Sequence, residues 1–252
     1  MASPFLPNPP HITNVTHRSH ALTVPHMVCI ALRFFASGTY LYAVNDAENL
    51  GKNTVCRNIR KVVIALQGYI NSFIVFPGHL STMSIKEGFY EIAGKIDRMT
   101  CDHECMITSL DAKWPGSVHD SQIFRESALC QLFEEGLFDG LLVGDRGYAC
   151  QRFLLTPYPD PQTRPQNRFN VALSKTRVKI EMTFGILKAR FNCLRQVRVS
   201  PERASILHNI ATIRKERVPP QNQLLPDEID PITLDHPAGA AVRDAITIQY
   251  FT

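Results

Sequence analysis

The sequence predicts an α/β fold preceded by a helical N-terminal module. The apolar run at 140–145 has the length and the glycine boundaries of a buried strand, and it ends at Asp145. A later segment repeats apolar residues with the i, i+4, i+7, i+11 spacing of an amphipathic helix. This stripe consists of Ile180, Phe184, Leu187 and Phe191. Near the N-terminus, Gly38 and Gly51 separate segments with helical patterns, which indicates helices joined by turns.

The composition is that of a globular chain of one or two domains. Of 252 residues, 44% are hydrophobic and 20% are charged. The net charge of +4 is compatible with a nucleic-acid partner but is insufficient to indicate one. No apolar run reaches membrane-spanning length, and the N-terminus, with four prolines in its first ten residues, does not resemble a signal peptide. Seven scattered cysteines, an odd number, predict reduced thiols in an intracellular compartment.

The segment at 21–92 is predicted to form a helical module after a mobile stretch at 1–20. Helices are expected from Thr23 to Ser37, over 42–50 and over 53–73. Helix, glycine-marked turn, helix is the pattern of a helix-turn-helix, whose second helix contacts bases and phosphates with its leading half. The basic residues at that position are Lys52, Arg57, Arg60 and Lys61. The alternative is an amphipathic helix whose basic residues only face water.

The segment at 93–217 carries the mixed pattern of the α/β domain. A strand is predicted over 106–112, a helix over 118–135, the buried strand up to Asp145, an irregular stretch over 156–165, a strand over 169–173 and a long helix from Thr176. The cluster Cys101-Asp102-His103-Glu104-Cys105 lacks the second ligand pair of a structural zinc site, so we interpret it as a turn. Residues 218–252 are predicted to be a partly ordered tail.

Asp145 and Glu181 are the candidate chemical groups. Asp145 lies at a strand end, where side chains reach the usual ligand position of an open α/β sheet, although an Asp that bonds its own turn explains Asp-Arg-Gly equally well. Glu181 lies about 100° from the apolar stripe and shares its helix face with Arg177 and Lys188. A carboxylate at this border suits a metal ligand beside a nucleic acid, and the alternative is a solvated Glu with helix neighbours.

From Ile74 onward the chain resembles the PIF/Harbinger-type transposase-derived nucleases, a family of DDE superfamily endonucleases. The matching segments are Trp114-Pro115-Gly116-Ser117-Val118-His119-Asp120-Ser121, Gly144-Asp145-Arg146-Gly147-Tyr148, Leu155-Thr156-Pro157-Tyr158, Arg168-Phe169-Asn170, Ile180-Glu181-Met182-Thr183-Phe184-Gly185-Ile186-Leu187-Lys188, Arg190-Phe191 and Leu207-His208-Asn209-Ile210. The resemblance covers roughly residues 70 to 215 and keeps the order of the family's motifs.

The resemblance implies an RNase H-like core that hydrolyses DNA phosphodiester bonds with Mg²⁺ or Mn²⁺. The implied catalytic residues are Asp97, Asp145 and Glu181, and the implied metal ligands are these three and Asp120. DNA contacts are expected from Lys52, Arg57, Arg60, Lys61, Arg177 and Lys188. A nuclear location and a separate DNA-binding or nuclear-import partner protein are implied as well. Asp120 has an equal alternative, because Ser117-Val118-His119-Asp120 also fits a helix capping box.

The chain departs from the family pattern after Gly94-Lys95-Ile96-Asp97. Family members continue with a segment that completes a hairpin, whereas here Arg98-Met99-Thr100 leads directly to Cys101, as after an internal deletion. We therefore expect an incomplete first hairpin, an uncertain first ligand in Asp97, and little or no nuclease activity. The alternative function is a catalytically inactive DNA-binding or protein-interaction protein. A smaller departure at Ser205-Ile206-Leu207 leaves His208 as part of a structural helix.

Overall fold

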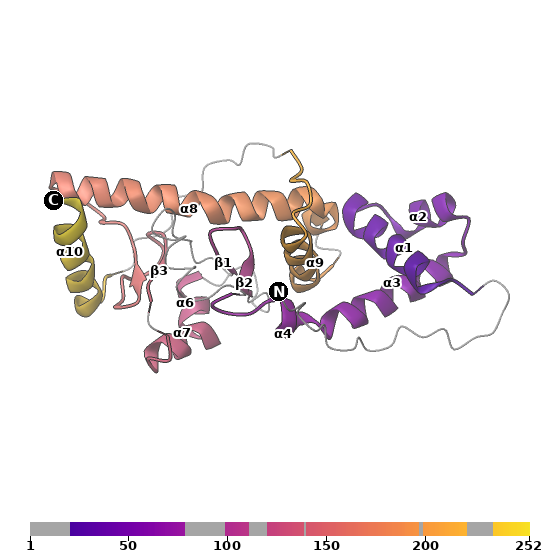
Figure 1. Cartoon of the computed structure of the whole chain (residues 1–252), viewed down its shortest axis with the longest axis horizontal. Helices are drawn as coiled ribbons and strands as arrows, with labels where there is room; N and C mark the ends of the chain where they lie inside the picture. The colour runs from indigo at the N-terminus through magenta and orange to yellow at the C-terminus, as the bar shows by residue number, and fades with distance from the viewer. Residues whose placement is uncertain (1–20, 79–98, 111–119, 139, 197–198, 221–233) are drawn as a thin grey trace. The chain divides into compact units, whose positions relative to one another are not determined.

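The computed structural model describes residues 21–78, 99–110, 120–138, 140–196, 199–220 and 234–252 (Figure 1). They form a helix-rich α/β structure with two small sheets, so the coarse fold class predicted from the sequence is confirmed. Two compact units are present. The helical unit contains the described residues of 1–74 and 186–221, and the mixed unit contains those of 75–185 and 222–252. The sequence-based boundaries at residues 92 and 217 stay predictions.

The helical unit begins with α1 (Val24–Ser37), α2 (Leu41–Glu48), α3 (Lys52–Gln67) and α4 (Ile70–Phe73). Thr23 caps α1 by accepting a hydrogen bond from the His26 N–H, and Gly38 ends the helix with a positive φ of 63°. Gly38 also lies against the backbone of Asn192, where a Cβ would come within 2.7 Å. Only a glycine therefore fits this helix end.

The apolar sides of α1 and α3 form the core of this unit, together with Val44 of α2. The buried residues of α1 and α3 include Met27, Ile30, Phe34, Phe35, Val55, Ile59 and Val62. The end of α8, the 3₁₀ helix η1 (Asn192–Gln196) and α9 (Pro201–Ile213) complete the unit. His208 is fully buried on α9, 3.5 Å from Arg190 Nη1 through its Nδ1 atom, which fits the structural role predicted for it.

The mixed unit contains a hairpin that the sequence analysis did not expect. Strand β1 (Met99–Cys101) pairs antiparallel with β2 (Ile107–Leu110), and a register irregularity follows Thr100. The Thr100 and Thr108 hydroxyls are 2.8 Å apart inside the pair. Met99, Thr100 and Cys101 form the first strand of this pair, and the cysteine-rich cluster supplies the turn. The incomplete family hairpin after Asp97 stays a prediction.

Two helices, α6 (Asp120–Arg125) and α7 (Ala128–Glu134), replace the single helix predicted over 118–135. The break has a local cause. Ser127 adopts an extended backbone, and its Oγ accepts a hydrogen bond from the Cys130 N–H, which starts a new helix. Both helices pack their apolar sides into one core cluster with Tyr148, Phe153 and Leu154.

Strand β3 (Leu142–Val143) is parallel to β4 (Leu154–Leu155), and this pair forms the second small sheet. The following helix α8 spans Arg164–Arg190. The strand predicted over 169–173 is therefore wrong. Phe169 and Leu173 are buried one helical turn apart, whereas Val171 between them is 56% exposed. The alternating apolar residues at 169, 171 and 173 predicted a strand, but they lie on a helix that buries only the first and the last of them.

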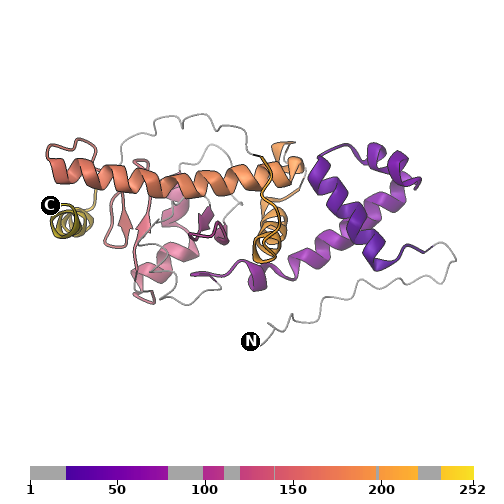
Figure 2. The same ribbon diagram turned by 45° about the horizontal axis from the view of Figure 1, so that its top comes forward.

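The C-terminal residues form α10 (Pro237–Phe251), a helix that the sequence analysis did not identify. In Figures 1 and 2 it lies beside the first half of α8. Its residues Val242, Ile246 and Phe251 pack on a cluster formed by Val143, Leu155, Tyr158, Phe169 and Leu173. All seven cysteines are free thiols, as predicted. Among the described residues, no helix has both the length and the apolar character required to cross a membrane.

Candidate active site

Asp145 follows β3 at the point where the strand leaves its sheet. The Gly144 N–H donates to the Leu155 carbonyl at 2.8 Å, which fixes the backbone up to the residue before Asp145. Asp145 is 6% exposed, and its Oδ1 accepts a hydrogen bond from the Gly147 N–H at 2.9 Å. This is the turn that the sequence analysis offered as the alternative to a ligand role. The turn engages Oδ1, and Oδ2 faces the side chain of Arg177.

Glu181 lies on α8, one helical turn after Arg177. The Nη2 atom of Arg177 is 4.0 Å from Asp145 Oδ2 and 4.0 Å from Glu181 Oε1. Both oxygens are 4.0 Å from the same nitrogen, so the two oxygens are at most 8.0 Å apart. A strand end and a helix thus bring two carboxylates, 36 positions apart in the sequence, to one cation.

The two carboxylates differ in their contact with solvent. The side chain of Asp145 is 9% exposed, that of Glu181 is 37% exposed, and that of Arg177 is 23% exposed. A buried carboxylate beside a partly exposed one needs a cation nearby, since two like charges in a poorly hydrated site repel each other. Arg177 supplies that cation in this structure. Within the described ranges, no group of three His, Cys, Asp or Glu residues has the geometry of a metal site.

The β1–β2 hairpin packs against the part of α8 that carries Glu181. The thiol of Cys101 on β1 is hydrogen-bonded to the side chain of Thr183, two residues after Glu181, and the charge of Lys179 is nearby. Burial raises the pKa of Cys101 to about 12, so this thiol is uncharged and behaves as a small apolar group. The hairpin is therefore fixed on α8 beside one of the two candidate carboxylates.

The turn of this hairpin is held by Asp102. Its Oδ1 accepts hydrogen bonds from the backbone N–H groups of Glu104 and Met106, each at 2.9 Å. This confirms the interpretation of the cysteine-rich cluster as a turn. Burial raises the pKa of the Asp102 carboxyl, and the two backbone donors offset part of that effect. The carboxylate serves the turn and is 2% exposed.

The remaining candidate residues are distributed over both units. Asp97 and the 117–119 part of the capping motif lie outside the described residues. Asp120 is the first described residue of α6, and its side chain also lies outside the description. Lys52, Arg57, Arg60 and Lys61 are all exposed on α3, and Lys188 is exposed on α8. The structure thus joins Asp145, Arg177 and Glu181, and leaves the metal and DNA roles as predictions.

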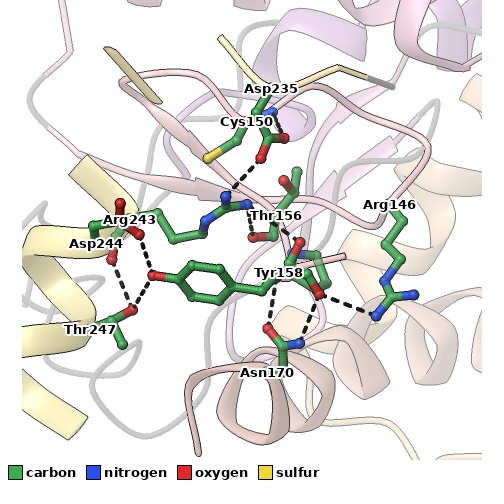
Figure 3. A network of polar contacts seen from close by, with 10 residues as sticks. Arg146, Cys150, Thr156, Tyr158, Asn170, Asp235, Arg243, Asp244 and Thr247 are labelled. Atoms are coloured by element: carbon green, nitrogen blue, oxygen red, sulfur yellow. Dashed lines mark hydrogen bonds and ion pairs between the residues drawn. The ribbon is translucent and has the colours of Figure 1, made fainter. Parts of the chain in front are cut away.

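Sequence reasoning missed a polar network that ends next to Asp145 (Figure 3). Arg146 Nη2 donates to the Tyr158 carbonyl at 3.2 Å, and the Asn170 side chain of α8 bonds both the N–H and the carbonyl of Tyr158. On the other side, the Tyr158 hydroxyl is hydrogen-bonded to Asp244 at 2.7 Å and to Thr247 at 2.9 Å. Helix α10 is thereby connected to the residue that follows Asp145.

Sequence comparison relates the region of this site to known proteins. Residues 97–214 match the family described as DDE superfamily endonuclease, so Asp97, Asp120, Asp145 and Glu181 all lie in the matched region. The human protein named "Putative nuclease HARBI1" is 29% identical over 247 residues, which cover 80% of this chain and 71% of the human protein. Its namesake from Xenopus laevis is 26% identical, over 79% of this chain and 71% of the relative. No solved structure matches the chain.

A plant protein named "Protein ALP1-like", from Arabidopsis thaliana, is 23% identical over 75% of this chain and 61% of its own length. The matched region and the mixed α/β structure make the chain similar to the DDE superfamily endonucleases. Within that class the chain is similar to the Harbinger-type nucleases.

Proposed function

We propose that this protein is a transposase-derived nuclease that hydrolyses DNA phosphodiester bonds with Mg²⁺ or Mn²⁺ and with low activity. The observation that carries the proposal is the meeting of Asp145 and Glu181 on one cation, the Arg177 guanidinium. Carboxylate oxygens are the ligands that Mg²⁺ prefers, and the guanidinium near both carboxylates supports a preference of this position for positive charge. The donor set therefore fits a divalent ion.

Asp145 and Glu181 would hold the metal. The chemistry that such a metal would supply is activation of a water molecule and stabilisation of the leaving 3′ oxygen. The protein's own contribution is positional: the turn bond from Gly147 orients Asp145, and the α8 backbone orients Glu181. Arg177 and Lys188 on α8 are proposed to bind DNA phosphates, because guanidinium and ammonium groups pair with phosphate oxygens.

An RNase H-like core with Asp97 and Asp120 as further ligands is part of the proposal. Support comes from the strand that starts two residues after Asp97, since Cys101 of that strand contacts Thr183 beside Glu181. The low activity is inferred from the same strand. Its three residues include a register irregularity. We infer that so short and irregular a strand gives the ligand two residues before it less support than productive geometry requires, about 0.5 Å.

The helical unit is proposed to bind DNA in the manner of a helix-turn-helix. Its support is the distribution of side chains on α3, where Lys52, Arg57, Arg60 and Lys61 are exposed on a helix that buries Val55, Ile59 and Val62. A nuclear location and a separate partner protein for DNA targeting or nuclear import complete the proposal.

The second candidate is a catalytically inactive DNA-binding or protein-interaction protein. One observation favours it: Asp145 and Glu181 already have a cationic partner in Arg177, and Asp145 also holds a turn. Both carboxylates therefore have a structural use that needs no metal.

The deciding experiment is a cleavage assay on duplex DNA with the full chain and Mn²⁺ or Mg²⁺. We expect weak, metal-dependent cleavage that is lost in Asp145→Asn and in Glu181→Gln. Asp160→Asn is the matched control, because Asp160 is an exposed carboxylate of the same unit with a local partner in Gln162. If the chain binds DNA but shows no cleavage that depends on Asp145 and Glu181, the inactive DNA-binding protein is the correct function. Loss of cleavage in Asp97→Ala would identify the first ligand.

A further inference from the structure

We propose that Arg177 is the resident counter-ion of the Asp145–Glu181 pair and competes with the divalent metal for it, so that metal uptake requires displacement of the guanidinium. This inference rests on the proposed function and adds a regulatory residue to the same site. Its basis is the position of one nitrogen, Nη2, at 4.0 Å from an oxygen of each carboxylate.

The position of Arg177 is not that of an ordinary surface ion pair. On a helix, a cation four residues before a carboxylate is the less favourable order, because the acidic partner is better placed N-terminal to the basic one. Arg177 has this order relative to Glu181, yet it also reaches Asp145 on the strand end. Its side chain is mostly buried, and only 23% of it is exposed. The contact with Asp145, which comes from a different element, contributes to holding the guanidinium there.

The distances between Arg177 and the two carboxylates suit a guanidinium that a metal ion can displace. Charge-assisted hydrogen bonds between a guanidinium and a carboxylate have N···O distances of about 2.7–2.9 Å. At 4.0 Å, Arg177 Nη2 neutralises both oxygens without closing on either one. Separating Arg177 Nη2 from these two oxygens therefore breaks contacts of 4.0 Å, which are longer than hydrogen bonds.

Arg177 and a metal ion would nevertheless exclude each other. A Mg²⁺ ion binds a carboxylate oxygen at about 2.0–2.1 Å. An ion on Asp145 Oδ2 or on Glu181 Oε1 would then lie within about 6 Å of the Arg177 nitrogen, which is 4.0 Å from each oxygen. Like charges this close in a poorly hydrated site repel strongly. The guanidinium therefore moves away when metal binds, or it weakens the binding.

The test is calorimetric titration of Mn²⁺ into the metal-free full chain and into Arg177→Gln. We expect Arg177→Gln to bind Mn²⁺ roughly tenfold more tightly, the order of effect of one neighbouring charge on a carboxylate. In the absence of metal, the same variant should have a lower Tm, because its carboxylates repel without a counter-ion. Its Tm should then rise more on addition of Mn²⁺ than that of the wild type.

Lys175→Gln is the matched control, since Lys175 is an exposed cation of the same helix and its loss changes the net charge equally. Its Mn²⁺ affinity should equal that of the wild type. Loss of Mn²⁺ binding in Asp145→Asn would show that the wild type binds the ion through Asp145. If Arg177→Gln then binds Mn²⁺ no more tightly than the wild type, the proposed competition is wrong, but the metal site is supported. If neither the wild type nor Arg177→Gln binds Mn²⁺, the metal site and the competition both fail.

If Arg177→Gln does not fold, Arg177→Lys is the variant to measure instead. The shorter ammonium retains one charge but loses the reach of the guanidinium, so Mn²⁺ binding should tighten by less than in the Gln variant. An affinity equal to or below that of the wild type would count against the competition.

Discussion

The guanidinium carbon of Arg243 lies 4.2 Å from the centroid of the Tyr158 ring. Arg243 comes from α10 and is nearly completely buried, and its Nη2 pairs with Asp235 at 2.7 Å. Its Nη1 donates to the carbonyls of Thr156 and Pro157, at 3.3 and 3.4 Å. One side chain thus connects the C-terminal helix to the segment that follows β4, through an ion pair, a ring contact and two backbone acceptors.

Arg243→Met should detach α10. Methionine keeps most of the volume but removes the ion pair and leaves the two carbonyls without this donor, a loss of about 2–4 kcal/mol. Hydrogen exchange of the α10 amides should become markedly faster than in the wild type. Arg164→Met, at an exposed position of the same unit, is the control and should leave these rates unchanged. Unchanged α10 protection in Arg243→Met would mean that the apolar contacts alone hold the helix.

Gly239→Ala should have a similar effect for a steric reason. A Cβ at Gly239 would come within 2.3 Å of the Cys150 carbonyl oxygen, and that atom belongs to the backbone of a turn that cannot rotate aside. We expect a destabilisation of at least about 2 kcal/mol, measured by urea denaturation of the mixed unit. Gly140→Ala is the control, because its Cβ would meet nothing within 4 Å. Equal stability of the two variants would show that α10 does not approach Cys150 this closely.

Asp102→Asn should flatten the dependence of hairpin stability on pH. Burial raises the pKa of the Asp102 carboxyl above its ordinary value of 3.8, so the folded chain retains this proton to a higher pH than the unfolded chain. The stability that the protonated form contributes is therefore lost as the pH rises from about 3.8 through the raised pKa. Asparagine does not titrate, and its Oδ1 still accepts the two backbone N–H groups.

Hydrogen exchange of the β1 and β2 amides at about pH 4 and about pH 7 would measure this effect. Protection should fall between the two pH values by more in the wild type than in Asp102→Asn. Asp102→Ala is the contrasting variant: it removes the acceptor and should lower protection at both pH values, by about 1–3 kcal/mol. Parallel pH profiles of the wild type and Asp102→Asn would refute the prediction.

Replacing Arg57 and Arg60 with Ala should weaken DNA binding by the helical unit. Each phosphate contact that is lost should reduce the slope of log affinity against log salt by about one unit. The measurement is fluorescence anisotropy with duplex DNA over a series of salt concentrations. Arg214→Ala, an exposed cation of the same unit, is the control. Binding and salt slope that match the wild type in both α3 variants would leave this helix as a packing surface.

The elements that the sequence predicted well have local signals. Helix α1 begins at a Thr cap followed by Pro25 and ends at Gly38, so its bounds depend only on neighbouring residues. The errors concern tertiary context. Phe169, Val171 and Leu173 alternate like a strand, but the apolar cluster beneath α10 covers only Phe169 and Leu173. The sequence analysis did not identify α10, so it could not use the apolar surface of α10 that favours a helix over 169–173.

The candidate site shows the same division. The placement of Asp145 at a strand end and of Glu181 beside an apolar helical stripe followed from periodicity. The shared helix face of Arg177 and Glu181 also followed from periodicity, but the contact of Arg177 with Asp145 did not. A contact between a helix and a strand 32 residues earlier depends on how the two elements pack, and no local pattern encodes that.

The distribution of the free thiols allows the helical unit to be labelled selectively with thiol reagents. Cys29 on α1 and Cys56 on α3 are exposed, whereas the other five cysteines are buried. Thiol reagents require an accessible thiolate, so a limiting amount of a maleimide dye should attach at these two positions. Cys56 immediately precedes Arg57 on the exposed basic part of α3. The unmodified protein therefore has an attachment point for a fluorophore beside its candidate DNA-binding surface, and Cys29→Ser alone would make that labelling site-specific.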